Sequence, residues 1–89
     1  MNAIVTVIGQ NRVGIIAAIS TRLAALGVDI LDVSQTILNG SFTMVMVVSL
    51  EGANASFVAI RDTLNELAAE RGLSLRIQRQ EIFEAMHTV

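Results

Sequence analysis

An Asn-Gly pair at positions 39 and 40 separates two stretches of strand-forming residues, 28–38 and 41–50. These two residue types accept the positive φ angles of a two-residue hairpin turn, so the two stretches are predicted to be antiparallel neighbours. Every second residue of the later stretch is apolar, which indicates a strand with one buried face. These residues are Phe42, Met44, Met46, Val48 and Leu50. The centre of the chain is therefore predicted to be a β-hairpin.

A strand followed by a helix precedes this hairpin. Residues 3–8 are a short apolar, β-branched run, which predicts a strand that is apolar on both faces, and residues 10–14 form a loop. Asn11 is the expected N-cap of the helix that follows, and Gly27 is expected to close it. The apolar residues at helical spacing in this helix are Ile16, Ile19, Leu23 and Leu26.

A helix followed by a strand comes after the hairpin. Asn54 is the expected cap of this helix, and Gly72 is expected to close it. Its apolar positions are Phe57, Ile60, Leu64, Leu67 and Ala68. Residues 73–78 then alternate between apolar and polar, which predicts a half-exposed edge strand. Beyond them, Ile82, Phe83 and Met86 fall on one side of a short helix that we expect to dock on the sheet or on a neighbouring subunit. A frayed tail is the alternative.

The predicted order is strand, helix, strand, strand, helix, strand. Two right-handed βαβ crossovers joined by a hairpin give an α+β fold, the ferredoxin-like βαββαβ sandwich. In this fold a four-stranded antiparallel sheet carries two helices on one face, and the first and third strands are central. We expect residues 1–80 to form this domain and residues 81–89 to form a C-terminal tail or short helix.

The composition predicts association between copies. A chain of 89 residues is small for a stable core, and the absence of cysteine excludes disulfides and thiolate metal sites. Hydrophobic residues make up 53% of the chain and charged residues 16%, which is more apolar than one small core needs. We therefore expect a homo-oligomer, either a dimer or a larger assembly. The apolar stretches are too short to span a membrane, and no basic segment leads the chain, so we expect a cytoplasmic protein without membrane contact.

Several functions found on this fold require residues that the chain lacks. A heavy-metal transfer domain needs a Cys-x-x-Cys pair, and an RNA-recognition domain needs stacking aromatic residues and a basic face. Only Phe42 is aromatic in the two central strands, and the six arginines are dispersed. His87 is the sole histidine and lies near the C-terminus, while Asp29 and Asp32 point to opposite faces of a strand. Arg12 lacks the glycine-flanked cradle that an acyl-phosphate hydrolase needs. The sequence therefore predicts no catalytic residue, no metal, no cofactor and no direct nucleic-acid contact.

The loop after the first predicted strand carries the residues best suited to a ligand. Gly9 and Gly14 let the backbone turn tightly and approach a ligand, and the amides that open the next helix favour a carboxylate. Asn11 can donate and accept hydrogen bonds, and Asp29 offers a negative charge to an ammonium group. This combination fits an α-amino acid. A simple helix cap at Asn11 and a solvated strand end at Asp29 are the alternatives.

Two stretches of the sequence resemble the ACT domain, and the likeness covers residues 2–80. They are Val7-Ile8-Gly9-Gln10-Asn11-Arg12-Val13-Gly14-Ile15-Ile16 and Leu23-Ala24-Ala25-Leu26-Gly27-Val28-Asp29-Ile30. Three further stretches make the chain similar to the standalone single-ACT proteins of the UPF0237 group. These are Asp32-Val33-Ser34-Gln35-Thr36, Phe42-Thr43-Met44 and Ile82-Phe83-Glu84-Ala85-Met86-His87. That group is itself similar to the halves of the glycine cleavage system regulator and to the regulatory part of some phosphoserine phosphatases.

The resemblance implies a regulatory module that binds amino acids at a subunit interface. In serine-binding members, the asparagine of the first loop and the asparagine that opens the second strand contact the ligand, and they align with Asn11 and Asp29. Those members carry histidine where this chain has Gly9, so the resemblance does not extend to serine. The predicted ligand residues are Gly9, Gln10, Asn11, Arg12, Val13, Gly14 and Ile15 of one copy with Asp29 of another.

Two hypotheses about function follow. In the first, the chain is a non-catalytic regulatory ACT-domain protein that binds a small amino acid at an oligomer interface. In the second, it is an assembly module that binds no small molecule and regulates a partner enzyme or regulator.

Overall fold

The computed structural model describes residues 1–10 and 14–87. The elements along the chain are β1 (Asn2–Gln10), α1 (Ile15–Ala25), β2 (Asp29–Leu38), β3 (Ser41–Ser49), α2 (Phe57–Arg71), β4 (Ser74–Arg79) and α3 (Gln80–His87). The strands form one antiparallel sheet in the order β2-β3-β1-β4. The predicted ferredoxin-like α+β fold is confirmed, with the first and third strands at the centre of the sheet.

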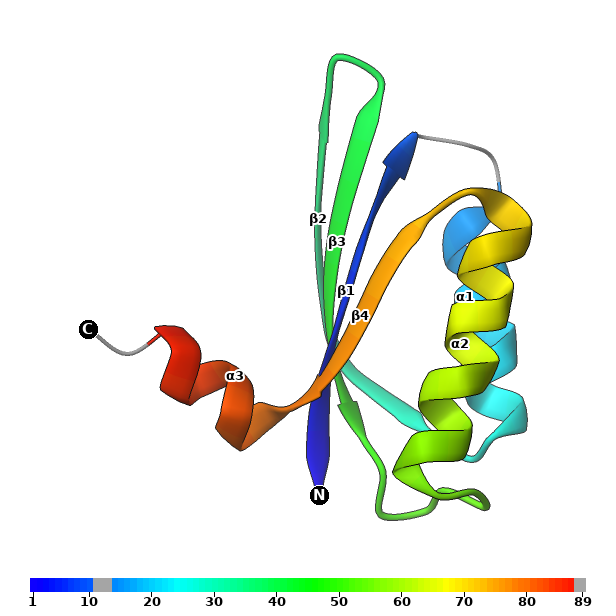
Figure 1. Ribbon diagram of the computed structural model, residues 1–89, viewed down its shortest axis with the longest axis vertical. Coiled ribbons are helices and arrows are strands. Elements are labelled where there is room, and N and C mark those ends of the chain that lie inside the picture. The colour runs from blue at the N-terminus through cyan, green and yellow to red at the C-terminus, as the bar shows by residue number, and fades with distance from the viewer. Residues whose placement is uncertain (11–13, 88–89) are drawn as a thin grey trace.

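The two faces of the sheet have different surroundings. Helices α1 and α2 cover one face, here called the helix face, whereas α3 lies on the other side, here called the outer face (Figure 1). Along β1, Ala3, Val5 and Val7 are fully buried against the helices. Side chains alternate along a strand, so Ile4 and Ile8 belong to the outer face. Ile8 is 49% exposed and Ile4 only 5%, so the outer face is open at the Ile8 end of β1.

The core fills the space between the helix face and the two long helices. From β3 it contains the predicted alternating residues, none of them more than 2% exposed: Phe42, Met44, Met46 and Val48. Helix α2 adds Ile60, Leu64 and Leu67. Helix α1 adds Ile15, Ile19 and Leu23. Ile16 was expected among them, but it is 39% exposed. The stripe facing the sheet follows i, i+4, i+8 from Ile15, and Ile16 lies one residue outside it.

The predicted turns have the expected backbone conformations. Asn39 and Gly40 have φ angles of 52° and 78°, which are the signs that a type I′ hairpin turn requires. Helix α1 ends at Ala25 and is followed by Gly27, whose φ is 72°. There the N–H of Gly27 donates to the Ala24 carbonyl and the N–H of Val28 donates to the Leu23 carbonyl, both at 3.0 Å. This pair of bonds is a Schellman motif, and it turns the chain back toward the sheet.

The predicted N-caps were placed at the wrong residues. Ser56, not Asn54, caps α2, because its Oγ accepts a hydrogen bond from the Ala59 N–H at 3.2 Å. Asn54 instead forms hydrogen bonds with the C-terminal end of α1. Its Nδ2 donates to the Ala25 carbonyl at 3.1 Å, and its backbone N–H donates to the Leu26 carbonyl at 2.9 Å. The N-cap position of α1 is held by Gly14, three residues after Asn11, which lies outside the described residues.

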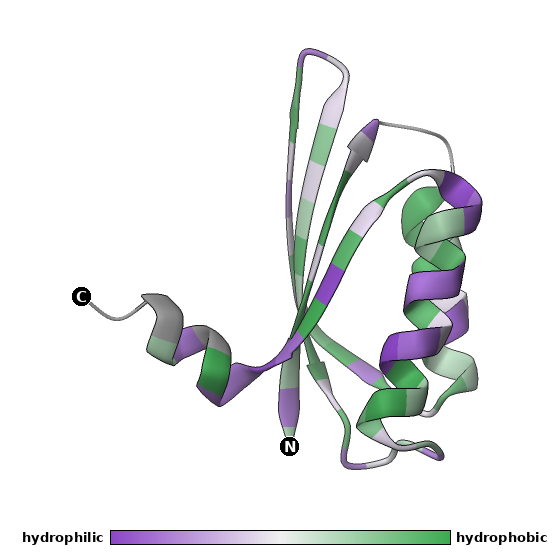
Figure 2. Cartoon of the chain, viewed as in Figure 1, coloured by the Kyte–Doolittle hydropathy of each residue, from purple (hydrophilic) through white to green (hydrophobic). Residues whose placement is uncertain are grey.

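Strand β2 forms one edge of the sheet and is exposed over most of its length. Its register against β3 shifts between Ile30 and Asp32, which leaves Leu31 as an extra residue in the strand. Ile30 packs against the core, but four other apolar side chains along the strand are between 42% and 69% exposed: Leu31, Val33, Ile37 and Leu38. The β2–β3 hairpin also extends past the ends of both long helices (Figure 2). The edge formed by β2 therefore carries apolar side chains that no part of residues 1–10 and 14–87 covers.

Candidate functional site

The loop predicted to bind a ligand connects β1 to α1. Strand β1 runs to Gln10 and α1 begins at Ile15, so the connection is residues 11–14. Asn11, Arg12 and Val13, three of the predicted ligand residues, lie outside the described residues. The described parts of the predicted site are the two ends of this loop, together with Asp29.

Gly9 has a packing role that the sequence did not predict. It continues β1, where it pairs with Phe42, and does not turn the chain. A Cβ atom at this position would lie 2.5 Å from Cδ2 of Leu73. Leu73 directly precedes β4, the strand that pairs with β1. The absence of a side chain at Gly9 therefore makes room for Leu73. Gln10 ends the strand opposite Ser41.

Gly14 leaves the start of α1 open. Its φ of 87° is left-handed, nothing lies within 4 Å of where its Cβ would be, and its carbonyl accepts the Ala18 N–H at 2.9 Å. A glycine has no side chain with which to cap the first amides, and the first turn of α1 contains no acidic residue. The N–H groups of Ile15, Ile16 and Ala17 precede any intrahelical acceptor. Helix α2 differs, since Ser56 occupies the equivalent end.

Ile15 contributes its backbone and not its side chain to this end of α1. Its side chain is 3% exposed and belongs to the core. An amide at the first position of a helix is fixed in direction when its side chain is locked in a core. Ile15 thus holds the start of α1, whose first amides no described side chain caps, at a fixed place above the sheet.

Asp29 lies at the opposite end of the sheet from this loop. It pairs with Ser49, which also pairs with Asn2, whereas Gln10 pairs with Ser41. The eight residue steps of β1 between these ends correspond to about 27 Å. One copy of the chain therefore does not bring Asp29 to the loop. Asp29 is exposed at the start of β2 and is available to a second copy.

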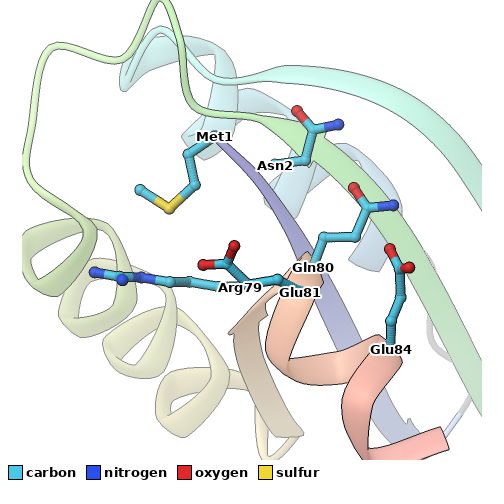
Figure 3. Close-up of a pocket in the computed structure, with 6 residues that line it drawn as sticks. All are labelled: Met1, Asn2, Arg79, Gln80, Glu81 and Glu84. Atoms are coloured by element: carbon cyan, nitrogen blue, oxygen red, sulfur yellow. The ribbon is translucent and has the colours of Figure 1, made fainter. Parts of the chain in front are cut away.

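Two surface hollows were not predicted from the sequence. One lies between α1 and α2 beside Gly14, and Thr21, Arg22, Glu70 and Arg71 supply its polar lining. The other lies where β4 passes into α3 and is lined by Met1, Asn2, Arg79, Gln80, Glu81 and Glu84. Figure 3 shows the side chains of Asn2, Gln80 and Glu84 together there, while that of Arg79 extends away from them. The Arg79 guanidinium lies 5.7 Å from the centre of the Phe57 ring. No periodic pattern in the sequence marks either hollow.

Groups suited to metal chemistry do not come together in the described part of the chain. Within residues 1–10 and 14–87, no three His, Cys, Asp or Glu side chains are placed to hold a metal ion. None of the described helices is long and apolar enough to cross a membrane. What the described geometry offers is a short connection that leads into uncapped helix amides, on a sheet with an unpaired edge.

Residues 2–78 match the family model of the ACT domain. A UPF0237 protein of Bifidobacterium longum is 45% identical over 98% of this chain and 97% of its own length. The chain belongs to the UPF0237 family of ACT-domain proteins. A second UPF0237 protein, from Clostridium acetobutylicum, is 44% identical over the whole of both chains. The relationship covers the complete sandwich together with α3.

Solved structures agree with this assignment to the ACT domain. An ACT domain protein from Streptococcus pneumoniae superposes with a TM-score of 0.81 at 38% identity, covering 94% of both chains. A putative glycine cleavage system transcriptional repressor superposes at 0.78 over 89% of this chain and 45% of its own, and at 23% identity this shows the shared fold alone. A formyltetrahydrofolate deformylase from Pseudomonas syringae contains a similar unit at 0.76 and 27% identity, covering 27% of its length. The UPF0237 chain thus matches only one part of these two larger proteins.

Proposed function

We propose that this UPF0237 protein is a non-catalytic regulatory module of the cytoplasm that binds a small amino acid between two copies of the chain. The observation that carries the proposal is the open start of α1. Helix α2 has a serine cap, whereas α1 begins at a glycine with no side-chain acceptor and no acidic residue in its first turn. A carboxylate is the group that uncapped helix amides and the helix dipole favour.

The unpaired edge of β2 supplies a way to complete this site. If two β2 strands pair antiparallel about a two-fold axis, Asp29 of one copy comes opposite Leu38 of the other. Leu38 pairs with Ser41, and Ser41 also pairs with Gln10, so this is the end of the sheet at which the loop leaves β1. The partner's Asp29 would bring a carboxylate for the ligand's ammonium group to the end where α1 provides amides for its carboxylate. An α-amino acid carries both groups.

A binding screen tests the proposal. Thermal unfolding of the protein is followed with each of the twenty amino acids at about 10 mM. A ligand at about 100 times its Kd adds roughly 2.7 kcal/mol of stability. We expect one or a few small amino acids to raise Tm, and their des-amino analogues to raise it less. Asn11→Ala and Asp29→Asn should remove the shift, whereas Asn65→Ala, an exposed asparagine on α2, should keep it. A shift that survives Asn11→Ala would exclude this loop.

The exposed apolar side chains of β2 favour the second candidate function, in which the fold serves only for assembly. Leu31, Val33, Ile37 and Leu38 are all exposed on one edge strand, and such an edge is a ready place for another strand to add. The same screen separates the two functions. If no amino acid shifts Tm while Val33→Lys abolishes self-association or capture of a partner, the assembly function is the correct one.

A further inference from the structure

The outer face of the sheet is apolar at its centre and polar at its edges. The two central strands contribute Ile4, Thr6 and Ile8 from β1 and Val45 and Val47 from β3. On the edge strands the same face includes Asp32 of β2, which is level with Val47, and Arg76 of β4, which is level with Thr6. Neither α1 nor α2 lies on this side (Figure 1). The outer face therefore has the composition of an interface core with a charged rim.

Helix α3 covers only one end of this face. It begins at Gln80, directly after β4 ends at Arg79, and it packs against β1 and β4. Ile4 is 5% exposed at that end, whereas Ile8, on the same face of the same strand, is 49% exposed. From this start α3 extends away from the sheet (Figure 1), and Ile82 is 48% exposed. An amphipathic helix thus extends from the outer face with an apolar residue uncovered.

The charges on the rim select one symmetric partner arrangement. A two-fold axis that runs along the strands, between two facing outer faces, lays β2 of each copy over β4 of the other. Asp32 of one copy then lies over β4 of the other, two residues (about 7 Å) along the strand from Arg76, and the contact occurs twice. An axis across the strands would instead lay β4 over β4 and bring arginine toward arginine. Asp32 accepts a hydrogen bond only from its neighbour Val33 in the described part of the chain, and Arg76 has no ion pair there.

The area of the face indicates that α3 takes part. Four strands about 4.8 Å apart and some 27 Å long present roughly 500 Å² on each copy. A standard interface buries about 800 Å² on each partner. The sheet alone falls short of this area, and α3 is the element that extends beyond it on the same side.

We propose that a second copy of the chain covers the outer face, with the two sheets packed face to face and each α3 lying against the other copy. Asp32 and Arg76 of opposite copies form the rim contacts that set the axis along the strands. This interface is separate from the β2 edge and does not rest on amino-acid binding. If both interfaces form, the protein is a tetramer.

Charge reversal and charge exchange test the arrangement by sedimentation velocity from about 1 to 100 µM. We expect Arg76→Asp and Asp32→Arg each to weaken the outer-face association about tenfold, because two rim pairs become repulsive. The double variant exchanges the charges and should restore association to within a few-fold of the natural chain. Ile82→Ser should also weaken it. Asp62→Arg and Val58→Ser, which change exposed residues of α2, are the matched controls and should have no effect. Circular dichroism checks that each variant is folded.

The outcomes separate this interface from the other one. A tetramer that Arg76→Asp converts to dimers supports the proposal, as does a dimer that it converts to monomers. If Asp32→Arg weakens association and Arg76→Asp does not, the contact lies on the β2 edge. This result overturns the outer-face proposal without affecting the proposed ligand site. A double variant as weak as the single ones, or a chain that is monomeric at every concentration, also overturns it.

Discussion

Gly27 satisfies two requirements at once, a left-handed backbone and close contact with another loop. Its φ is 72°, and a Cβ at this position would lie 2.5 Å from the carbonyl oxygen of Gly52. Gly40 has a similar φ of 78°, but its Cβ would meet nothing within 4 Å. The left-handed conformation alone costs an L-residue about 1–2 kcal/mol. A backbone clash in a packed region adds roughly 1–3 kcal/mol.

We therefore expect Gly27→Ala to lower the free energy of unfolding by roughly 3 kcal/mol and Gly40→Ala by about 1 kcal/mol. Urea denaturation of both variants at one protein concentration measures the difference. Equal losses would mean that Gly52 moves aside freely, and that the contact between these two loops contributes nothing to stability.

Asn54 offers a second prediction at the scale of single residues. Its side-chain amide donates to the Ala25 carbonyl at the end of α1. Asn54→Ala removes this bond and should cost about 1 kcal/mol. Asn54→Asp should cost more, because a carboxylate cannot donate and lies against the negative end of the helix dipole. Thermal unfolding at neutral pH ranks the two variants, with the same pair of changes at exposed Asn65 as the control. A stability of Asn54→Asp equal to that of the natural chain would show that the bond is absent in solution.

At the scale of elements, the sequence predicted the helices and strands well because each has a periodic pattern. The alternation of Phe42 to Val48 and the Asn39-Gly40 turn depend on local chemistry alone, and both were confirmed. The N-caps were assigned wrongly because asparagine suits loops and helix ends alike, whereas the closing glycines Gly27 and Gly72 were assigned correctly. Only the packed structure shows that Asn54 reaches the end of α1, 29 residues earlier in the chain.

The candidate site could be predicted only in part from the sequence. The pattern around Gly14 located the loop correctly, since a glycine before a helix is a local signal. The packing of Leu73 against Gly9 joins segments that are distant in sequence, and no local pattern indicates it. Similarly, the separation of Asp29 from the loop follows from the sheet register, which is a property of the folded chain.

The two helix starts lead to a prediction about α2. Ser56→Ala removes the acceptor for the Ala59 N–H and should cost about 1 kcal/mol. Ser56→Asp should retain the stability, because aspartate also caps and its charge suits the amino end of a helix. Amide hydrogen exchange should accelerate at Ala59 in the alanine variant alone. Ser20→Ala, within α1, is the control. If both Ser56 variants lose equal stability, the serine acts through packing and not through its hydrogen bond.

At the scale of the whole molecule, an 89-residue chain has two surfaces that its own helices leave open. The β2 edge carries Val33 and Ile37, and the outer face carries Ile8 beside α3. A small domain buries a low fraction of its surface on folding and is only marginally stable alone. Covering either surface with a second copy makes the folded state depend on protein concentration, since only folded chains associate.

Tm should therefore rise with concentration. A tenfold increase in concentration, from about 10 to 100 µM, favours the folded dimer by about 1.4 kcal/mol, which is about 0.7 kcal/mol for each chain. For a chain of this size this raises Tm by roughly 3–5 °C. Val33→Lys acts at the β2 edge and Arg76→Asp at the outer face, so each should reduce the rise, and together they should abolish it. Calorimetry at both concentrations measures the shift, with Asp62→Arg expected to behave like the natural chain. A natural chain whose Tm is independent of concentration would mean that both open surfaces face water, because association cannot stabilise a fold without making its stability depend on the number of copies present.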